Sequence, residues 1–258
     1  MADALDMLAR NALRLVESGY YDRPVIGQRA RARHSLSKTI TSHPSFPIIA
    51  EVKLSSPSKK GIAIHGPDRL IQAYVEGGAA AISVLTEPTH FDGDLSILSM
   101  TSGHGVPVLM KDIVIDERQL LAAYRNGADA VLLIEGVFSC NSIRKDRDSL
   151  LEKAHSLGLE SLLEVADETE LESALKSRAD LIGINQRNLR DMSLDASKGE
   201  RMLRATDSRK PMIVMSGIDS RHQVESLRDA GAAAVLIGSS LSASPDPVAR
   251  LRSLAVSR

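Results

Sequence analysis

The sequence lacks tryptophan and has only one cysteine, Cys140. A single cysteine cannot form an internal disulfide, which favours a reducing compartment. No stretch approaches the ~20 consecutive apolar residues that a membrane-spanning helix needs. The N-terminus carries Asp3 and Asp6 where a signal peptide requires an apolar run. We therefore expect a cytoplasmic protein that does not insert into a membrane.

The sequence also lacks an excess of either charge, since its net charge is −1. A chain this close to neutral has no long-range attraction for nucleic acid or an anionic membrane. The basic run at Arg29, Arg31, Arg33 and His34 contains no aromatic residue, so we interpret it as a solvated connector rather than a nucleic-acid patch. The seven histidines show neither HxH nor HExxH spacing. We predict no metal site and no other cofactor.

No Pro-, Gly- or Ser-rich linker divides the 258 residues, 43% of which are hydrophobic. One domain over residues 1–258 is therefore favoured over two domains of half that size. A length near ~250 residues suits a single (β/α)8 barrel.

One sequence segment, called a phrase below, recurs four times, at residues 78–85, 127–134, 178–184 and 231–238. Each copy has a pair of turn-forming residues followed by an apolar run. In three copies the phrase opens with glycine, which can end a helix at positive φ before the chain enters a buried strand. Asp116 and Ser220 are good N-caps for the helices that precede two of these copies. The copies start 49, 51 and 53 residues apart. This period is long enough for two β-strand and α-helix units.

A second type of apolar segment lies between these phrases, at residues 47–51, 107–111, 160–164 and 211–215. The two segment types together give eight alternating βα units, which predicts a closed parallel barrel over residues 47–258. Residues 1–46 precede it as a helical extension, with one helix expected before Gly19. The predicted strands are 47–53, 81–86, 107–111, 130–134, 161–165, 181–185, 211–215 and 234–238.

Charged residues occupy the ends of several predicted strands. The last aligned position of the second segment type holds Glu51, Lys111, Glu164 and Met215 in turn, and Lys53 follows Glu51 on the same face. Strand carboxyl ends form the mouth of such a barrel, where active sites lie, and burying charge without a purpose is costly. We interpret these residues as catalytic, with an ion-pair belt that only closes the barrel as the alternative.

Other polar residues at strand ends suit an anionic ligand. Asn185 ends the sixth strand and is able to hydrogen-bond a substrate, unless it is a turn residue; Arg187 is either a carboxylate partner or a solvated charge. Ser216-Gly217 and Gly238-Ser239 follow strands seven and eight, where barrels commonly bind phosphate through backbone N–H groups. The polar loop 54–61 is either a lid over the ligand or a solvated loop.

These segments together resemble the indole-3-glycerol phosphate synthase family of the tryptophan pathway, from about residue 47 to 247. The absence of tryptophan agrees with this resemblance, since enzymes of that pathway often avoid it. Six segments in order carry the likeness. They are Ile49–Lys53 with Ser56-Pro57-Ser58, Pro107–Asp112, Leu163–Val165, Gly183–Leu189, Ser216–Ile218 and Leu236–Leu241.

The resemblance implies a phosphorylated small-molecule substrate, 1-(2-carboxyphenylamino)-1-deoxyribulose 5-phosphate, which is closed to an indole with loss of carbon dioxide and water. It implies that Lys111 is the acid for ring closure, Glu164 the base and Lys53 a second acid, while Glu51 and Asn185 position the substrate. The residues implied to line the anthranilate pocket are Ser56, Phe91, Leu132, Arg187 and Leu189.

Two positions depart from the family pattern: Met215 replaces a usual glutamate and Ile113 a usual phenylalanine. Two alternatives therefore stay open. One is a relative that binds a phosphorylated ligand without turnover. The other is a different phosphate-binding barrel enzyme, such as a sugar-phosphate isomerase or a Schiff-base aldolase that uses Lys111. The sequence does not determine the oligomeric state.

Overall fold

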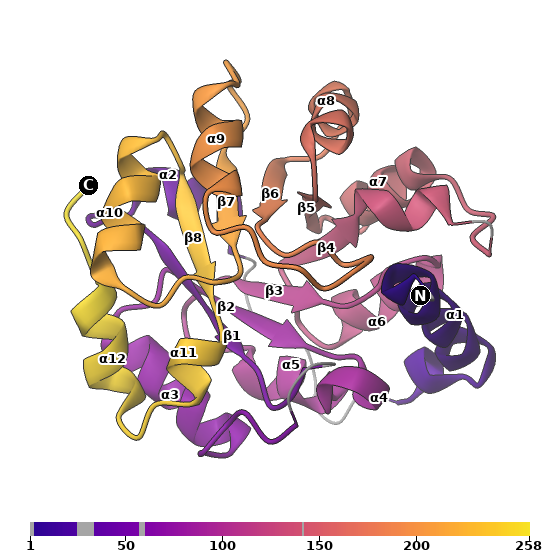
Figure 1. The fold of residues 1–258 in the computed structure, drawn as a ribbon. Helices are drawn as coiled ribbons and strands as arrows, with labels where there is room; N and C mark the ends of the chain where they lie inside the picture. The colour runs from indigo at the N-terminus through magenta and orange to yellow at the C-terminus, as the bar shows by residue number, and fades with distance from the viewer. Residues whose placement is uncertain (1–2, 25–33, 57–59, 141) are drawn as a thin grey trace.

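The structure is a computed structural model that describes residues 3–24, 34–56, 60–140 and 142–258. Eight parallel strands pair in sequence order and β8 pairs with β1, so the sheet closes into a (β/α)8 barrel (Figure 1). The predicted fold class is confirmed, and each end of every predicted strand lies within one residue of the observed end. The strands are β1 Ile48–Val52, β2 Ala81–Leu85, β3 Val108–Lys111, β4 Ala130–Ile134, β5 Glu160–Val165, β6 Leu181–Asn185, β7 Met212–Met215 and β8 Ala234–Ile237.

Helices connect the strands around the outside of the barrel (Figure 1). Two of them begin with a complete capping box, formed by Asp116 with Gln119 and by Ser220 with Gln223. The helices are α1 Ala4–Glu17, η1 Tyr20–Asp22, α2 Leu36–Ser42, α3 Pro67–Gly77, α4 Pro88–Phe91, α5 Leu95–Thr101, α6 Glu117–Arg125, η2 Glu135–Ser139, α7 Arg147–Ser156, α8 Glu168–Lys176, α9 Lys198–Arg204, α10 Arg221–Asp229, α11 Ser239–Ser242 and α12 Pro247–Leu254. None of the helices within the described ranges is long and apolar enough to span a bilayer.

The recurring glycine has the conformation that the sequence pattern predicts. Gly78, Gly127 and Gly231 have φ of 88°, 87° and 101°, and each precedes an inward turn of the chain to a strand. The fourth copy has no glycine, and there the chain leaves α8 through Ser177 at φ −74°. Glycine is thus retained where the turn needs a left-handed residue.

Two apolar layers hold the barrel together. One lies between the strands and the surrounding helices; the other fills the barrel interior with side chains such as Ile49, Leu109 and Leu162. Leu5 and Leu8 of α1 belong to the interior layer, so the N-terminal helix closes one side of the barrel mouth. The predicted N-terminal extension therefore contributes to the site. The basic run Arg29, Arg31 and Arg33 and the loop tip 57–59 lie outside the described residues.

Candidate active site at the barrel mouth

The first acid–base pair at the mouth comes from β1. Glu51 lies within the strand and is 3% exposed, and Lys53 follows the strand's last residue. Lys53 Nζ is 3.6 Å from Glu51 Oε1. The Lys53 backbone N–H donates to Ser242 Oγ at 3.2 Å, which fixes the point where the chain leaves the strand.

The second pair joins three strands. Lys111 Nζ at the end of β3 is 3.7 Å from Glu164 Oε2 on β5. Asn185 at the end of β6 donates through Nδ2 to Glu164 Oε1 at 2.7 Å. The Asn185 Oδ1 accepts from the Arg187 backbone N–H at 2.9 Å, so the amide orientation is set from both sides.

The charges at the mouth favour a protonated lysine. Burial opposes the Lys111 charge, but the nearby Glu164 and Glu51 carboxylates outweigh it and raise the pKa of the ammonium. Glu51 Oε2 and Glu164 Oε2 are buried and have no hydrogen-bond partner among the described residues. The site therefore holds a proton donor beside two buried carboxylates, each with one oxygen that makes no hydrogen bond to a described residue, and that oxygen of Glu164 lies beside the Lys111 ammonium.

An apolar cavity of about 220 Å³ opens beside these residues. It is lined by side chains from α1, the first two loops and the ends of β2, β3, β4 and β6. The predicted pocket residues Ser56, Phe91, Arg187 and Leu189 line it, together with Lys53, Lys111 and Asn185. Sequence reasoning missed Leu8, Ile62, Leu85, Ile134 and Met192, which complete its apolar wall.

Leu132 occupies a different place from the one expected. It is fully buried in the barrel interior, and β4 presents Ile134 to the cavity instead. The two side chains lie on the same face of β4, one position apart along that face. The pocket-lining role predicted for Leu132 is therefore carried in this structure by Ile134.

Phe91 is held in the wall by a buried carboxylate. Glu87 is 1% exposed and caps α4, accepting from the Thr89 and His90 backbone N–H groups at 2.8 and 2.7 Å. Asn11 of α1 donates to the same carboxylate at 2.7 Å. The N-terminal helix and the loop that carries Phe91 are thus fixed to each other.

A second, more polar cavity adjoins the first, with Lys53, Lys111, Arg187, Ser216 and Ser239 bordering both. The four residues of the predicted phosphate site, Ser216, Gly217, Gly238 and Ser239, all line it. Ser216 and Gly217 both have positive φ, 72° and 74°. This conformation is uncommon for serine and turns the backbone at the end of β7.

Gly238 lies in close contact with Glu51. A Cβ at this position would overlap Glu51 Oε1 and lie 3.1 Å from its Cδ. The absence of a side chain at position 238 therefore leaves room for the Glu51 carboxylate. This holds whether or not the Gly238 backbone N–H binds a ligand.

Met215 lies between the barrel core and the polar cavity. Its side chain is 1% exposed and belongs to the interior layer, yet it also borders the cavity that Glu51, Lys53 and Lys111 line. A Cβ on Gly183 would lie 2.6 Å from Met215 Cε. The flexible thioether thus fills the space that the glycine leaves open.

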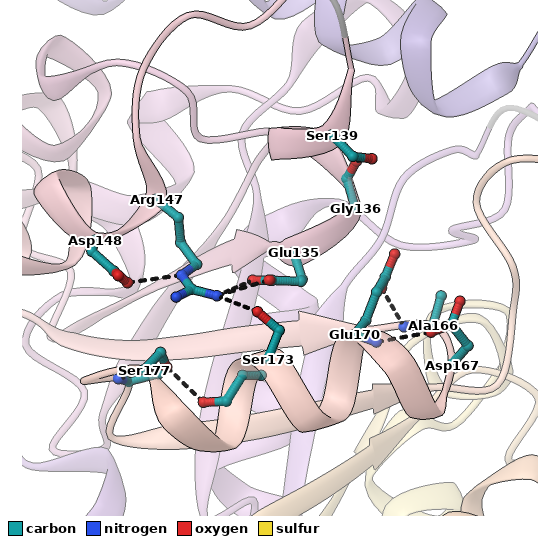
Figure 2. A network of polar contacts seen from close by, with 12 residues as sticks. Glu135, Gly136, Ser139, Arg147, Asp148, Ala166, Asp167, Glu170, Ser173 and Ser177 are labelled. Carbon is teal, nitrogen blue, oxygen red and sulfur yellow. Dashed lines mark hydrogen bonds and ion pairs between the residues drawn. The ribbon is translucent and has the colours of Figure 1, made fainter.

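A polar network behind β4 and β5 supports the strand ends (Figure 2). Arg147 Nη1 contacts both Glu135 carboxylate oxygens, at 2.7 and 2.9 Å. Glu170 accepts from the Ala166 backbone N–H at 2.8 Å, and burial raises the pKa of the Glu170 carboxyl. Because Ala166 follows Glu164 by two residues, this bond fixes the end of β5 that carries the carboxylate.

The arrangement at the mouth suits acid–base chemistry by side chains. Among the residues the structure describes, no group of three or more His, Cys, Asp or Glu side chains is placed to hold a metal ion. Lys53 and Lys111, each paired with a buried glutamate, border both the apolar and the polar cavity, whereas Glu51 borders only the polar cavity and Glu164 borders neither.

Two solved structures of 14% and 15% identity resemble the chain, and a likeness at this identity shows the fold alone. Thiamine phosphate pyrophosphorylase from Pyrococcus furiosus superposes with a TM-score of 0.61 at 14% identity, covering 85% of this chain and 96% of that one. The N-acetylmannosamine-6-phosphate 2-epimerase from Clostridium perfringens gives a TM-score of 0.58 at 15% identity, covering 83% and 93%.

Sequence comparisons are more specific. The family model for indole-3-glycerol phosphate synthase matches residues 17–254. Indole-3-glycerol phosphate synthase from Campylobacter jejuni is 41% identical, covering 79% of this chain and 84% of its own length. Indole-3-glycerol phosphate synthase 1 from Streptomyces coelicolor is also 41% identical, covering 78% and 74%. The chain belongs to the indole-3-glycerol phosphate synthase family.

Proposed function

We propose that this chain is a carbon–carbon lyase that converts 1-(2-carboxyphenylamino)-1-deoxyribulose 5-phosphate to indole-3-glycerol phosphate, carbon dioxide and water. The observation that carries this proposal is the position of Lys111, which borders both an apolar and a polar cavity and whose Nζ lies 3.7 Å from Oε2 of the buried Glu164 carboxylate. The substrate has the same division: an aromatic ring at one end and a phosphate at the other.

The two cavities suit the two ends of this substrate. The aromatic ring would pack against apolar side chains such as Phe91 and Leu189, and Arg187, which lines the same cavity, would pair with its carboxylate. The phosphate would accept from backbone N–H groups at Ser216-Gly217 and at Gly238-Ser239, where α11 begins. The reacting carbons then lie between them, beside Lys111.

Ring closure joins the ring carbon that carries the carboxylate to the ketone carbon of the sugar. Negative charge develops on the ketone oxygen, and Lys111 donates its proton there. The carbon–carbon bond to the carboxylate then breaks, and its electron pair restores the aromatic ring as carbon dioxide leaves.

Dehydration follows as the last step. Lys53 protonates the departing hydroxyl, which leaves as water, while Glu164 accepts the proton that the ring loses. Asn185 holds Glu164 in place through the 2.7 Å hydrogen bond to Oε1, which leaves Oε2 available to accept. Glu51 keeps the Lys53 ammonium close to the polar cavity.

A turnover assay tests this proposal directly. Indole formation is followed by fluorescence, on a low background because the chain has no tryptophan. We expect signal from the wild type and a loss of most of it in Lys111→Ala. A wild type that the substrate protects against thermal unfolding without turnover would instead support a binding protein. Borohydride trapping of a sugar phosphate on Lys111 would support an aldolase.

A further inference from the structure

A second buried carboxylate, Asp112, directly follows Lys111 and has no role in the steps above. It is 3% exposed. Its Oδ2 accepts from the Tyr21 hydroxyl at 3.0 Å and from Thr86 Oγ1 at 2.5 Å, and its Oδ1 accepts from the Ile113 backbone N–H at 2.7 Å. Three donors from three segments of the chain therefore meet on one side chain.

We propose that Tyr21 and Asp112 are positioning residues for Lys111, so that the turn after the N-terminal helix sets the direction of the ammonium. This inference rests on the proposed role of Lys111 as an acid.

The connection between Asp112 and Lys111 runs through the backbone. The Thr86 N–H donates to the Lys111 carbonyl at 3.2 Å, while its side chain donates to Asp112. Leu85 is paired with Lys111 in the strand register. The ends of β2 and β3 are thus tied together at residues 86, 111 and 112. Rotation of the backbone at Lys111 would break the bonds to Asp112.

The donors around Asp112 also keep it ionised near neutral pH. Burial raises the pKa of its carboxyl to about 6, against the hydrogen bonds, which lower it. The charged or titratable groups that face it are Tyr20 and Tyr21 of η1, Glu87 after β2 and its neighbour Lys111. Removing the Tyr21 donor should therefore raise the pKa of Asp112 further.

The chain supplies a matched control beside Tyr21. Tyr20 and Tyr21 are both buried, at 4% and 1% exposure, and their rings meet edge to face at 4.9 Å. Tyr20 donates to the Thr86 carbonyl at 2.9 Å and not to the Asp112 carboxylate. Tyr20→Phe and Tyr21→Phe thus each remove one buried hydroxyl, but only the second removes a donor to Asp112.

The experiment compares kcat and KM across pH 5–9 for the wild type and both variants. For Tyr21→Phe we expect kcat to fall by roughly 3- to 10-fold at neutral pH, the size of one hydrogen bond, with KM within about twofold. The acidic limb of its kcat profile should move upward by about one pH unit. Tyr20→Phe should lose comparable thermal stability but leave that limb in place.

Identical acidic limbs in the two variants, or a fall in kcat/KM that comes from KM alone, would overturn the proposal. If Tyr21→Phe does not fold, Thr86→Val removes the other side-chain donor to Asp112 without touching the N-terminal turn; a wild-type kcat and pH profile in that variant would overturn the proposal equally. NMR titration of the Lys111 side chain in Tyr21→Phe needs no turnover. An unchanged Lys111 titration contradicts the positioning role, whereas absent wild-type turnover contradicts only the proposed function.

Discussion

Gly238→Ala should reduce turnover by displacing Glu51 rather than by blocking phosphate. The added Cβ would overlap Glu51 Oε1 and lie 3.1 Å from Cδ and 3.2 Å from Cβ of the same side chain, so the carboxylate must move away. Forcing a buried side chain off its rotamer costs about 0.5–1.5 kcal/mol, and overpacking a core about 1–3 kcal/mol. Misplacement of a site group by about an ångström can lower a rate by up to about 10²-fold. We expect kcat to fall by roughly 10- to 100-fold.

The assay separates the two ways in which the Cβ could act. Inorganic phosphate is used as a competitor of the substrate, and its inhibition constant reports on the phosphate site. Displacement of Glu51 lowers kcat and leaves that constant within about twofold of the wild type. Gly66→Ala is the matched control, since a Cβ there meets nothing within 4 Å and the residue does not have positive φ.

A double-mutant cycle on stability completes the test. Glu51→Ala removes the two atoms that the Cβ approaches most closely, so Gly238→Ala should cost less in that background, with a coupling of about 1–2 kcal/mol. Additive stability changes, together with a tenfold or greater rise in the inhibition constant of phosphate at retained kcat, would refute the displacement of Glu51. Gly238 would then serve the ligand alone.

Four further outcomes are expected from the same geometry. Lys111→Ala should fold and lose about 10²- to 10⁴-fold in kcat; retention of a third of the activity would exclude it as the acid. Glu164→Gln, which preserves the shape but not the basicity, should lower kcat with binding within a few-fold, and an unchanged kcat would exclude the base role. Met215→Glu should raise kcat/KM about tenfold, because the new carboxylate would share a cavity with Lys111; a large fall in Tm without a gain in rate would contradict this. The pKa of the Asp112 carboxyl is raised from 3.8 to about 6, so the stability that its protonated form contributes is present below about pH 4 and is lost as pH rises through 6. Asp112→Asn should therefore remove about 2 kcal/mol of the fall in unfolding free energy between pH 4 and pH 7, measured by urea unfolding.

The barrel could be predicted from the sequence because its signals are local and repeated. Each strand contains a short apolar run, and in three copies of the repeated segment the strand follows a glycine whose φ is positive. Asp116 and Ser220, the expected helix N-caps, both form capping boxes. A fourfold repeat also fixes the number of strands, which a single apolar segment cannot.

The cavity wall could not be predicted in the same way, because it depends on how distant elements pack. Leu8 reaches the mouth only because α1 lies against the barrel, and nothing in its own segment indicates that. Whether Leu132 or Ile134 lines the cavity depends on how far along β4 the cavity extends. The contact of Gly238 with Glu51 joins strands at opposite ends of the chain, which pair as β1 and β8.

The mouth is also where the chain departs from ordinary folding rules. Among the described residues, four buried side-chain atoms lack a hydrogen-bond partner, and two of these are Glu51 Oε2 and Glu164 Oε2. A buried polar atom with no partner at all lowers stability by about 1–3 kcal/mol, and the lysine ammonium 3.7 Å from Glu164 Oε2 offsets part of that cost there. Ser216, at the polar cavity, adopts the left-handed conformation that serine seldom takes. Locally unfavourable features such as these are retained in proteins where they serve ligand binding or catalysis. A bound substrate that supplied hydrogen-bond donors to these carboxylates would recover, in binding, stability that is lost in folding the site.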